Sequence, residues 1–238
     1  MNNCTRPCSF PLQRRAFTLA EVLITLVIVG VVVALTIPVT VAKYHEQQTI
    51  QALKVTYSSF AQAFRKAEAE NGPIETWDLV APDSSVGAWN IYNNIIPALS
   101  ILKTCGKSAD CFADNYLTLQ GDVTTLQPKN HPCTVRGMLS NGVSFAVWSN
   151  GVCNGGFYSD MCGILDVDIN GYKKPNRFGY DYFSFKITPN GLIPYGTSNS
   201  ELTFRCSVGS GNRENGKACS AWVLYKNNFD YKKQNVSW

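Results

Sequence analysis

The stretch "RRAFTLAEVLITLVIVGVVVALTIPVTVA" (residues 14–42) decides the architecture of this chain. One acid, Glu21, precedes 21 consecutive uncharged and mostly apolar residues, from Val22 to Ala42. At 1.5 Å per residue, a helix of that length reaches about 30 Å, the thickness of a bilayer core. A single segment can satisfy its backbone in lipid only as a helix, so a membrane-spanning helix is predicted. Three arginines precede the run, which places the N-terminus in the cytoplasm and the chain after Lys43 outside.

Three kinds of processing are compatible with this segment. A secretory signal would be cut after Ala42, but the apolar run exceeds the usual 7–15 residues and Glu21 lies near its start. The letters "RRAFT" superficially resemble a twin-arginine export signal, although Arg-Arg is common before apolar runs. The third kind, which we favour, is a cut before the apolar run that leaves the run in the mature protein.

The segment "RRAFTLAEVLITLVIVGVVVALTIP" closely resembles the N-terminus of type IV pilins and type II secretion pseudopilins. In that family a prepilin peptidase removes a short basic leader before a Phe and methylates the new N-terminus. The resemblance implies that residues 1–16 are removed by cleavage between Ala16 and Phe17, and that Phe17 is N-methylated. The family usually has Gly before the cut, whereas this chain has Ala16.

Cleavage before Phe17 would provide a charged partner for Glu21. Cleavage creates a cationic amine on Phe17, four residues before Glu21, and an acid within an apolar segment is functional when a partner exists. In a filament, the terminus of one subunit pairs with Glu21 of a neighbour and fixes the stagger between them. The alternative is that Glu21 merely lies near the headgroups. Gly30 and Pro38 fall where many family members have helix-loosening residues, and they permit a kink or local melting.

The helix is predicted to continue beyond the membrane. Apolar residues spaced three or four apart form one helical face, comprising Ile50, Leu53, Tyr57, Phe60, Phe64 and Ala67. The letters "ENGP" (residues 70–73) then supply a stop. We expect one helix from Phe17 to Asn71, whose second part (residues 43–73) packs on the chain's own head. A coiled-coil stalk is the alternative, but charged residues are too sparse to define pairs between strands.

The head (residues 74–238) is predicted to be an antiparallel sheet, which gives an α+β, pilin-like fold with the long helix packed on it. Two hairpins are expected, at residues 134–151 with a turn at 140–142 and at residues 180–196 with a turn at 189–191. A strand is expected to end near Asn170. Residues 89–105 suggest a short helix interrupted near Pro97, and residues 218–231 fit either a helix or a closing strand.

Cysteine usage indicates an exported head. Cys4 and Cys8 lie in the leader, and exported domains retain disulfides. Proximity suggests the pairs Cys105–Cys111, Cys153–Cys162 and Cys206–Cys219, with Cys133 odd, although spacing does not fix connectivity. Many pilins carry a C-terminal disulfide loop similar to residues 206–219. Zinc is disfavoured because C-x-x-C is absent and the chain has two histidines.

One stretch after the expected strand suggests an ion site. Asp166, Asp168 and Asn170, followed by glycine, match the first half of an EF-hand loop, D-x-D-x-N-G. The twelfth position is Arg177 instead of Glu, which excludes a standard EF-hand. A different calcium site would need Asp181 to fold back. The alternative is a turn whose side chains bond the backbone; no cofactor is otherwise required.

Other function classes find little support. Of the net charge of +4, +3 lies in residues 1–16, so the remainder lacks the basic cluster of a nucleic-acid-binding protein. His45 and His131 lie in no nucleophile–base pattern, and "GSGNREN" (residues 209–215) lacks the Lys-Ser/Thr ending of a phosphate loop, so we expect no enzyme.

The resemblance therefore implies a structural subunit of a type IV pilus or a type II secretion filament in the bacterial inner membrane. Its expected partners are a prepilin peptidase, copies of itself and other pilins, and an assembly platform with its ATPase. Two alternatives stay open. One is a low-copy tip subunit whose head binds a surface, DNA or a secreted cargo, and the other is an anchored protein that never polymerises.

Overall fold

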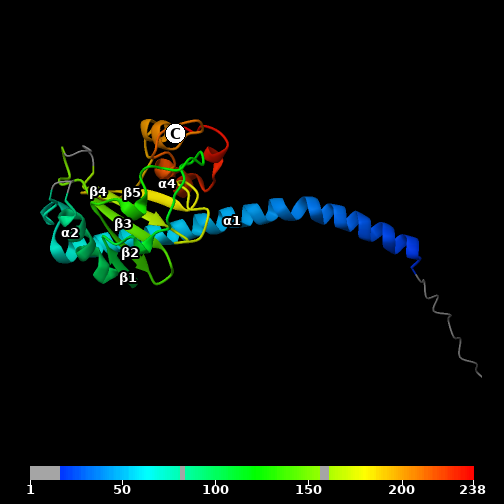
Figure 1. The fold of residues 1–238 in the computed structure, drawn as a ribbon, viewed down its shortest axis with the longest axis horizontal. Helices are drawn as coiled ribbons and strands as arrows, with labels where there is room; N and C mark the ends of the chain where they lie inside the picture. The colour runs from blue at the N-terminus through cyan, green and yellow to red at the C-terminus, as the bar shows by residue number, and fades with distance from the viewer. Residues whose placement is uncertain (1–16, 81–83, 156–160) are drawn as a thin grey trace, which may run out of the picture. The chain divides into compact units, whose positions relative to one another are not determined.

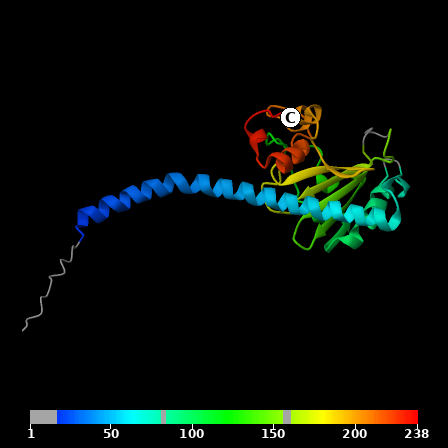
Figure 2. The same cartoon turned by 180° about the vertical axis from the view of Figure 1, so that it is seen from behind.

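The computed structural model describes residues 17–80, 84–155 and 161–238 (Figures 1 and 2). The chain divides into two compact units, Met1–His45 and Glu46–Trp238. Helix α1 (Leu19–Asn71) contributes to both, and every other described helix and strand belongs to the second unit, the head.

Helix α1 confirms the prediction of one continuous helix that ends at Asn71. Its C-terminus is followed by Gly72 in the left-handed region (φ 81°), which glycine adopts without a Cβ clash. The buried residues of α1 form one stripe, comprising Ile50, Leu53, Thr56, Phe60, Ala63, Phe64 and Ala67. The stripe includes Thr56 and Ala63, which the apolar spacing did not single out, while Tyr57 is half-buried.

The head is built on one six-stranded antiparallel sheet whose strands lie in chain order. The strands are β1 (Ile101–Gly106), β2 (Thr134–Leu139), β3 (Ser144–Ser149), β4 (Gly163–Asp168), β5 (Tyr182–Thr188) and β6 (Gly191–Pro194). Both predicted hairpins are confirmed, as β2–β3 and β5–β6. In the first, Gly142 takes φ 88° in the turn, a conformation that favours glycine.

The inner face of the sheet, which carries Val135, Val147, Leu165 and Phe185 in register, packs on the head part of α1. Tyr57 of α1 stacks on Phe185 with ring centroids 5.4 Å apart. Phe60 meets Phe145 edge-on at 5.1 Å. Figure 2 shows this cyan part of α1 lying across the sheet. The alternation of apolar residues along the strands therefore provides a continuous core for the apolar stripe of the helix.

In two regions of the head, the structure departs from the predicted secondary structure or decides between its alternatives. Within residues 89–105 the short helix interrupted near Pro97 is confirmed, but the chain beyond it is a strand: α2 (Val86–Ile95) is followed by a short turn of helix (Ile96–Ala98) and then by β1. Pro97 cannot continue the hydrogen bonding of α2, and the chain beyond it pairs with β2 instead. The ambiguous segment near the C-terminus is helical, as α4 (Ser220–Lys226), preceded by α3 (Asn199–Arg205).

The outer face of the sheet carries Arg136, Ala146, Asp166 and Ser184 in register. It is covered by irregular chain and by a second, smaller core, formed by Cys105, Cys111, Phe112, Tyr116, Met138, Ala146, Phe178 and Tyr182. Several polar residues of this face are buried, including Arg136 and Ser184. Burial of this kind requires hydrogen-bond partners, and these partners define the candidate sites below.

Candidate functional site

The first described residues place Glu21 in a cap of its own helix. Thr18 donates to the Glu21 carboxylate from both its backbone N–H and its Oγ1, each at 2.8 Å, and the Glu21 N–H donates to Thr18 Oγ1 at 3.2 Å. This reciprocal pattern is a capping box. The signal T-x-x-E before an apolar run was visible in the sequence and was missed. Phe17 is exposed, and Ala16 lies outside the described residues, as does the leader.

The apolar part of α1 is long and apolar enough to cross a membrane. Three threonine hydroxyls in this part donate hydrogen bonds to backbone carbonyls of the same helix. Thr25, Thr36 and Thr40 donate to the carbonyls of Val22, Val32 and Thr36 at 2.9–3.0 Å. Such bonds satisfy hydroxyl groups that would otherwise have no hydrogen-bond partner in lipid.

Gly30 and Pro38 both lie inside this helix, which continues through them. A Cβ on Gly30 would meet nothing within 4 Å in this chain, so the position leaves space for a neighbouring helix. Pro38 supplies no N–H to the helix, which weakens one turn. Helix loosening at these two positions stays a prediction.

On the outer face, Arg136 organises the covering loops. Its guanidinium donates to the carbonyls of Pro128 (2.7 Å), Lys107 (3.1 Å) and His131 (2.6 Å). Arg136 is 1% exposed, and burial lowers its pKa. It was not predicted as a site residue, because a lone Arg in a strand has no sequence signature and the Lys107 carbonyl that it binds lies 29 residues before it.

Asp166, a predicted calcium ligand, has other partners. Lys217 Nζ lies 3.2 Å from Asp166 Oδ2, and Ser184 Oγ donates to Asp166 Oδ1 at 2.5 Å. The Asp166 and Lys217 side chains are both 12% exposed. Asp166 is thus neutralised by an ion pair with Lys217, and we leave it out of any cation site.

The other three predicted ligands are Asp168, at the end of β4, and Asn170 and Asp181 in the β4–β5 loop (residues 169–181). Asp168 accepts hydrogen bonds from the Tyr116 hydroxyl and from the Asn170 N–H (3.1 Å). Asp181 accepts from the N–H groups of Asn176 (2.7 Å) and Arg177 (2.6 Å), and from Asn170 Nδ2 (3.2 Å). The turn with side chain–backbone bonds is therefore present, with both carboxylates at its base.

The electrostatics of this pair are unusual. Asp168 is 0% exposed and Asp181 is 2% exposed. Burial, followed by the charge of Asp181, raises the pKa of Asp168 well above its ordinary value. Burial also raises the pKa of Asp181, against the hydrogen bonds that lower it. Two carboxylates share a buried environment that disfavours a second negative charge.

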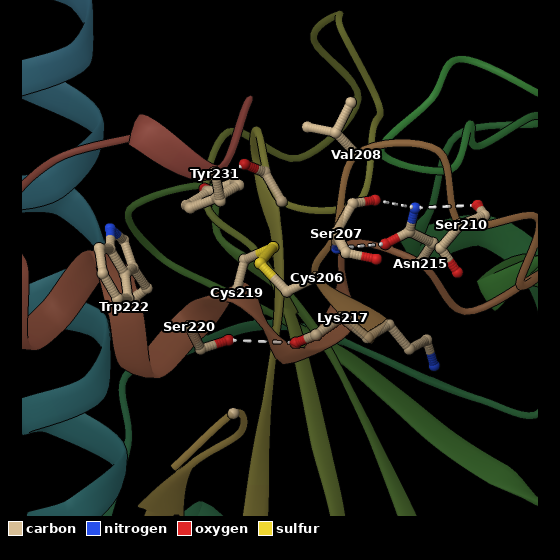
Figure 3. The surroundings of a disulfide bond; sticks show 12 residues. Cys206, Ser207, Val208, Ser210, Asn215, Lys217, Cys219, Ser220, Trp222 and Tyr231 are labelled. Carbon is tan, nitrogen blue, oxygen red and sulfur yellow. Dashed lines mark hydrogen bonds between the residues drawn. A yellow bond between two sulfur atoms is a disulfide. The ribbon is translucent and has the colours of Figure 1, made fainter. Parts of the chain in front are cut away.

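The three disulfides have the predicted connectivity: Cys105–Cys111, Cys153–Cys162 and Cys206–Cys219. The remaining cysteine of the head, Cys133, is partly exposed. Figure 3 shows the third disulfide beside Asn215, whose amide is buried in the loop that this disulfide closes. Asn215 accepts from the Ser207 N–H at 3.1 Å and donates to the carbonyls of Ser207 (2.9 Å) and Ser210 (3.1 Å).

A cavity of about 400 Å³ opens on the outer face between β2–β4 and the C-terminal disulfide loop. Its lining combines apolar, aromatic and charged side chains, among them Leu126, His131, Trp148, Ile164, Asp166, Arg213 and Lys217. Burial, followed by the charge of Lys217, lowers the pKa of His131, so that its imidazole is neutral at pH 7. The cavity is large enough for a small ligand or a side chain of a partner.

Comparison with known proteins identifies one region of the chain. Residues 12–37 match the prokaryotic N-terminal methylation motif. No curated protein and no solved structure matches the chain. The long apolar N-terminal helix, the antiparallel sheet and the disulfides are consistent with a pilin. The chain thus carries at its N-terminus the signature of type IV pilins and pseudopilins.

Proposed function

We propose that this protein is a structural subunit of a type IV pilus or type II secretion filament. The observation that carries the proposal is the methylation motif at residues 12–37, which includes the start of the apolar helix α1 at Leu19. A prepilin peptidase would cut between Ala16 and Phe17 and methylate the new amine. The exposure of Phe17 and of the apolar part of α1 supports this, because both are available to a membrane enzyme and to neighbouring helices.

In this proposal Glu21 changes partners during assembly. Before assembly, the hydrogen bonds from Thr18 stabilise its carboxylate and the start of α1. In an apolar filament core, the cationic amine of a neighbour's Phe17 provides a stronger, charge-assisted partner than the Thr18 hydroxyl. The pairing removes two isolated charges at once, and it sets the axial stagger of the subunits.

The same proposal assigns the topology and the machinery. The arginines before the apolar run keep the N-terminus cytoplasmic, and the head with its disulfides is exported to an oxidising compartment. Transfer of an apolar helix out of lipid needs external work, which an assembly ATPase and a membrane platform would supply.

N-terminal analysis and intact mass of the protein from its native membrane test the processing. A chain that begins at methylated Phe17 is expected. A chain that begins at Met1 or Lys43 would contradict the proposal, because Glu21 would then lack its amine partner.

Two variants test the assembly step. Glu21→Ala should abolish filaments recovered by shearing, whereas Thr18→Ala, which removes only the side-chain half of the cap, should leave the filament yield within about twofold. Equal yields from Glu21→Ala and the unaltered protein would refute the role of Glu21.

A second candidate function is a binding module at a filament tip, and the outer-face cavity favours it. Its lining includes Arg213, Trp148 and Ile164, a mixture suited to a ligand with an apolar body and an anionic group. Immunogold labelling distinguishes the candidates. Label along the whole filament supports the structural subunit, and label confined to the tip supports the binding module.

A further inference from the structure

We propose that the outer-face cavity binds a small organic acid, with the apolar body of the acid against the sheet and its carboxylate on Arg213. The inference rests on the second candidate function, because it names the ligand class of the same cavity, and it is independent of the filament proposal. Three observations carry it: the anchored walls of the cavity, its apolar floor, and the sign of the charge that its polar side chains leave uncompensated.

The walls of the cavity are two loops whose backbones are fixed by buried polar side chains. The first wall is formed by residues 126–133, and Arg136 donates to two of its carbonyls at 2.7 and 2.6 Å. The second wall is formed by residues 213–217, where the hydroxyl of the buried Thr124 donates to the Arg213 carbonyl at 2.7 Å. A cavity with anchored walls is present before a ligand binds, so few groups lose freedom on binding.

The floor of the cavity is apolar and comes from the sheet. Trp148 of β3 and Ile164 of β4 lie opposite each other in the strand register, and both are half-buried on the outer face. Leu126, Pro128 and Ala146 add to the apolar part of the lining. An aromatic or branched aliphatic body that covers this floor is removed from water together with it, which favours binding.

The acids of the lining already have cationic partners. Lys217 Nζ lies 3.2 Å from Asp166 Oδ2, and Arg205 Nε lies 2.6 Å from Glu214 Oε2. The side chains of both pairs are mostly buried. A cationic ligand would have to displace a lysine or an arginine from such a pair and leave its charge without a partner, which is costly. The cavity is therefore poorly suited to a cation.

Arg213 supplies the charge that stays uncompensated. Within residues 17–80, 84–155 and 161–238, no ion pair involves Arg213, and the residue is exposed. The imidazole of His131 adds no charge at pH 7, because its pKa is lowered. The planar guanidinium of an arginine matches a carboxylate with two parallel hydrogen bonds. The lining thus favours an anion, and a carboxylate in particular.

The size of the cavity and the mixture of groups favour a small molecule over a side chain of a partner. A volume of about 400 Å³ lies near the lower end of the range of small-molecule sites, about 300–1,000 Å³. Among protein side chains, the carboxylates are carried on short aliphatic stems, and the aromatic side chains carry no anion at pH 7. A ring or branched chain joined to a carboxylate meets both the floor and Arg213.

Calorimetric titration of the full-length protein in detergent with phenylacetate tests the proposal, with detergent alone as the blank. Phenylacetate is expected to bind saturably with a Kd of about 0.1–5 mM, as befits so small a ligand. Phenylacetamide keeps the ring without the charge, and acetate keeps the charge without the ring; each is expected to bind at least about tenfold more weakly. No saturable heat up to about 20 mM phenylacetate, or equal binding of either control compound, would overturn the proposal.

Variants separate the two halves of the site. Arg213→Gln removes the cation and keeps the carbonyl that Thr124 binds, so it should weaken phenylacetate binding about tenfold and leave Tm without ligand nearly unchanged. Ile164→Thr keeps the β-branched shape and makes the floor less apolar, so it should weaken binding about threefold. Arg65→Gln, at an exposed arginine of α1, is the matched control and should bind like the unaltered protein. Equal affinities of Arg213→Gln and Arg65→Gln would overturn the assignment.

Two further outcomes distinguish the small acid from its alternatives. A short peptide that ends in phenylalanine and binds more than about tenfold tighter than phenylacetate would overturn the proposal in favour of the C-terminus of a partner chain. Immunogold label along the whole filament, with the affinity for phenylacetate retained, would contradict the tip location alone and support the ligand class. The ligand class and the second candidate function can therefore fail separately.

Discussion

Removal of the Cys206–Cys219 disulfide should destabilise the head mainly through its unfolded state. The bond joins residues with a sequence separation of 13, and both cysteines are 0% exposed. Closing a loop of about that length restricts the unfolded chain by about 3 kcal/mol in the chain-entropy description. At about 2–4 °C per kcal/mol for a domain of this size, the variant Cys206→Ala/Cys219→Ala should lose roughly 6–12 °C in Tm.

The assay is thermal unfolding of the full-length protein in detergent, followed by circular dichroism. The double variant Cys105→Ala/Cys111→Ala is the matched control, because its disulfide spans a separation of six. The same relation then gives about 2 kcal/mol, and a smaller loss of Tm.

A third variant distinguishes the unfolded chain from the folded loop. Asn215→Ala removes the hydrogen bonds that hold the loop in Figure 3 and leaves the buried Ser207 N–H without its acceptor, at a cost of about 1–3 kcal/mol. If the disulfide acts through the unfolded chain, this loss should add to that of the disulfide within about 0.5 kcal/mol. A coupling above about 1 kcal/mol, or a disulfide effect below about 1 kcal/mol, would refute the reasoning.

Three further predictions concern the head. Phe60→Ala should lower the free energy of unfolding by about 3–5 kcal/mol in urea titrations, because Phe60 is fully buried against Phe145; a loss below about 1 kcal/mol would contradict the packing. Lys217→Met should cost about 3–5 kcal/mol by leaving Asp166 buried without its cation, and Asp166→Leu in the same chain should restore most of that loss. Stability should fall as pH rises from about 4 towards the raised folded-state pKa of Asp168, since the folded state there binds the extra proton; Asp168→Asn should remove this contribution from the pH profile, and an unchanged profile would count against it.

The helix and the hairpins were predictable because their signals are local. In α1 the apolar spacing and the Asn-Gly-Pro stop lie within a few turns of each other, and in β2–β3 the turn Ser-Asn-Gly directly follows the strand β2. Strand β1 was missed because its pairing with β2 is irregular, with register shifts between Ile101 and Lys103 and between Thr104 and Gly106. Such a strand lacks the period-two pattern that sequence reasoning uses.

The candidate sites were predictable only in part, because some of the residues that form them are distant in sequence. Asp168, Asn170 and Asp181 lie in one short segment, so a turn pattern suggested them together. The role of Asp166 depends on Lys217, 51 residues away in sequence, which only the fold brings within 3.2 Å. Asn176 likewise binds Asp181 through loop closure, and it has no sequence signature of its own.

The contrast between the two faces of the sheet explains why this head buries charged residues at all. A helix covers the inner face, and a helix satisfies its own backbone, so apolar side chains suffice there. Irregular loops cover the outer face, and their carbonyls and N–H groups need partners that the loops do not supply. Arg136 binds three such carbonyls, and Asp181 accepts two such N–H groups. The polar outer face therefore holds loops in place, and the pair Asp168–Asp181 stands apart from it because burial raises the pKa of both carboxyl groups despite their hydrogen bonds to the loop.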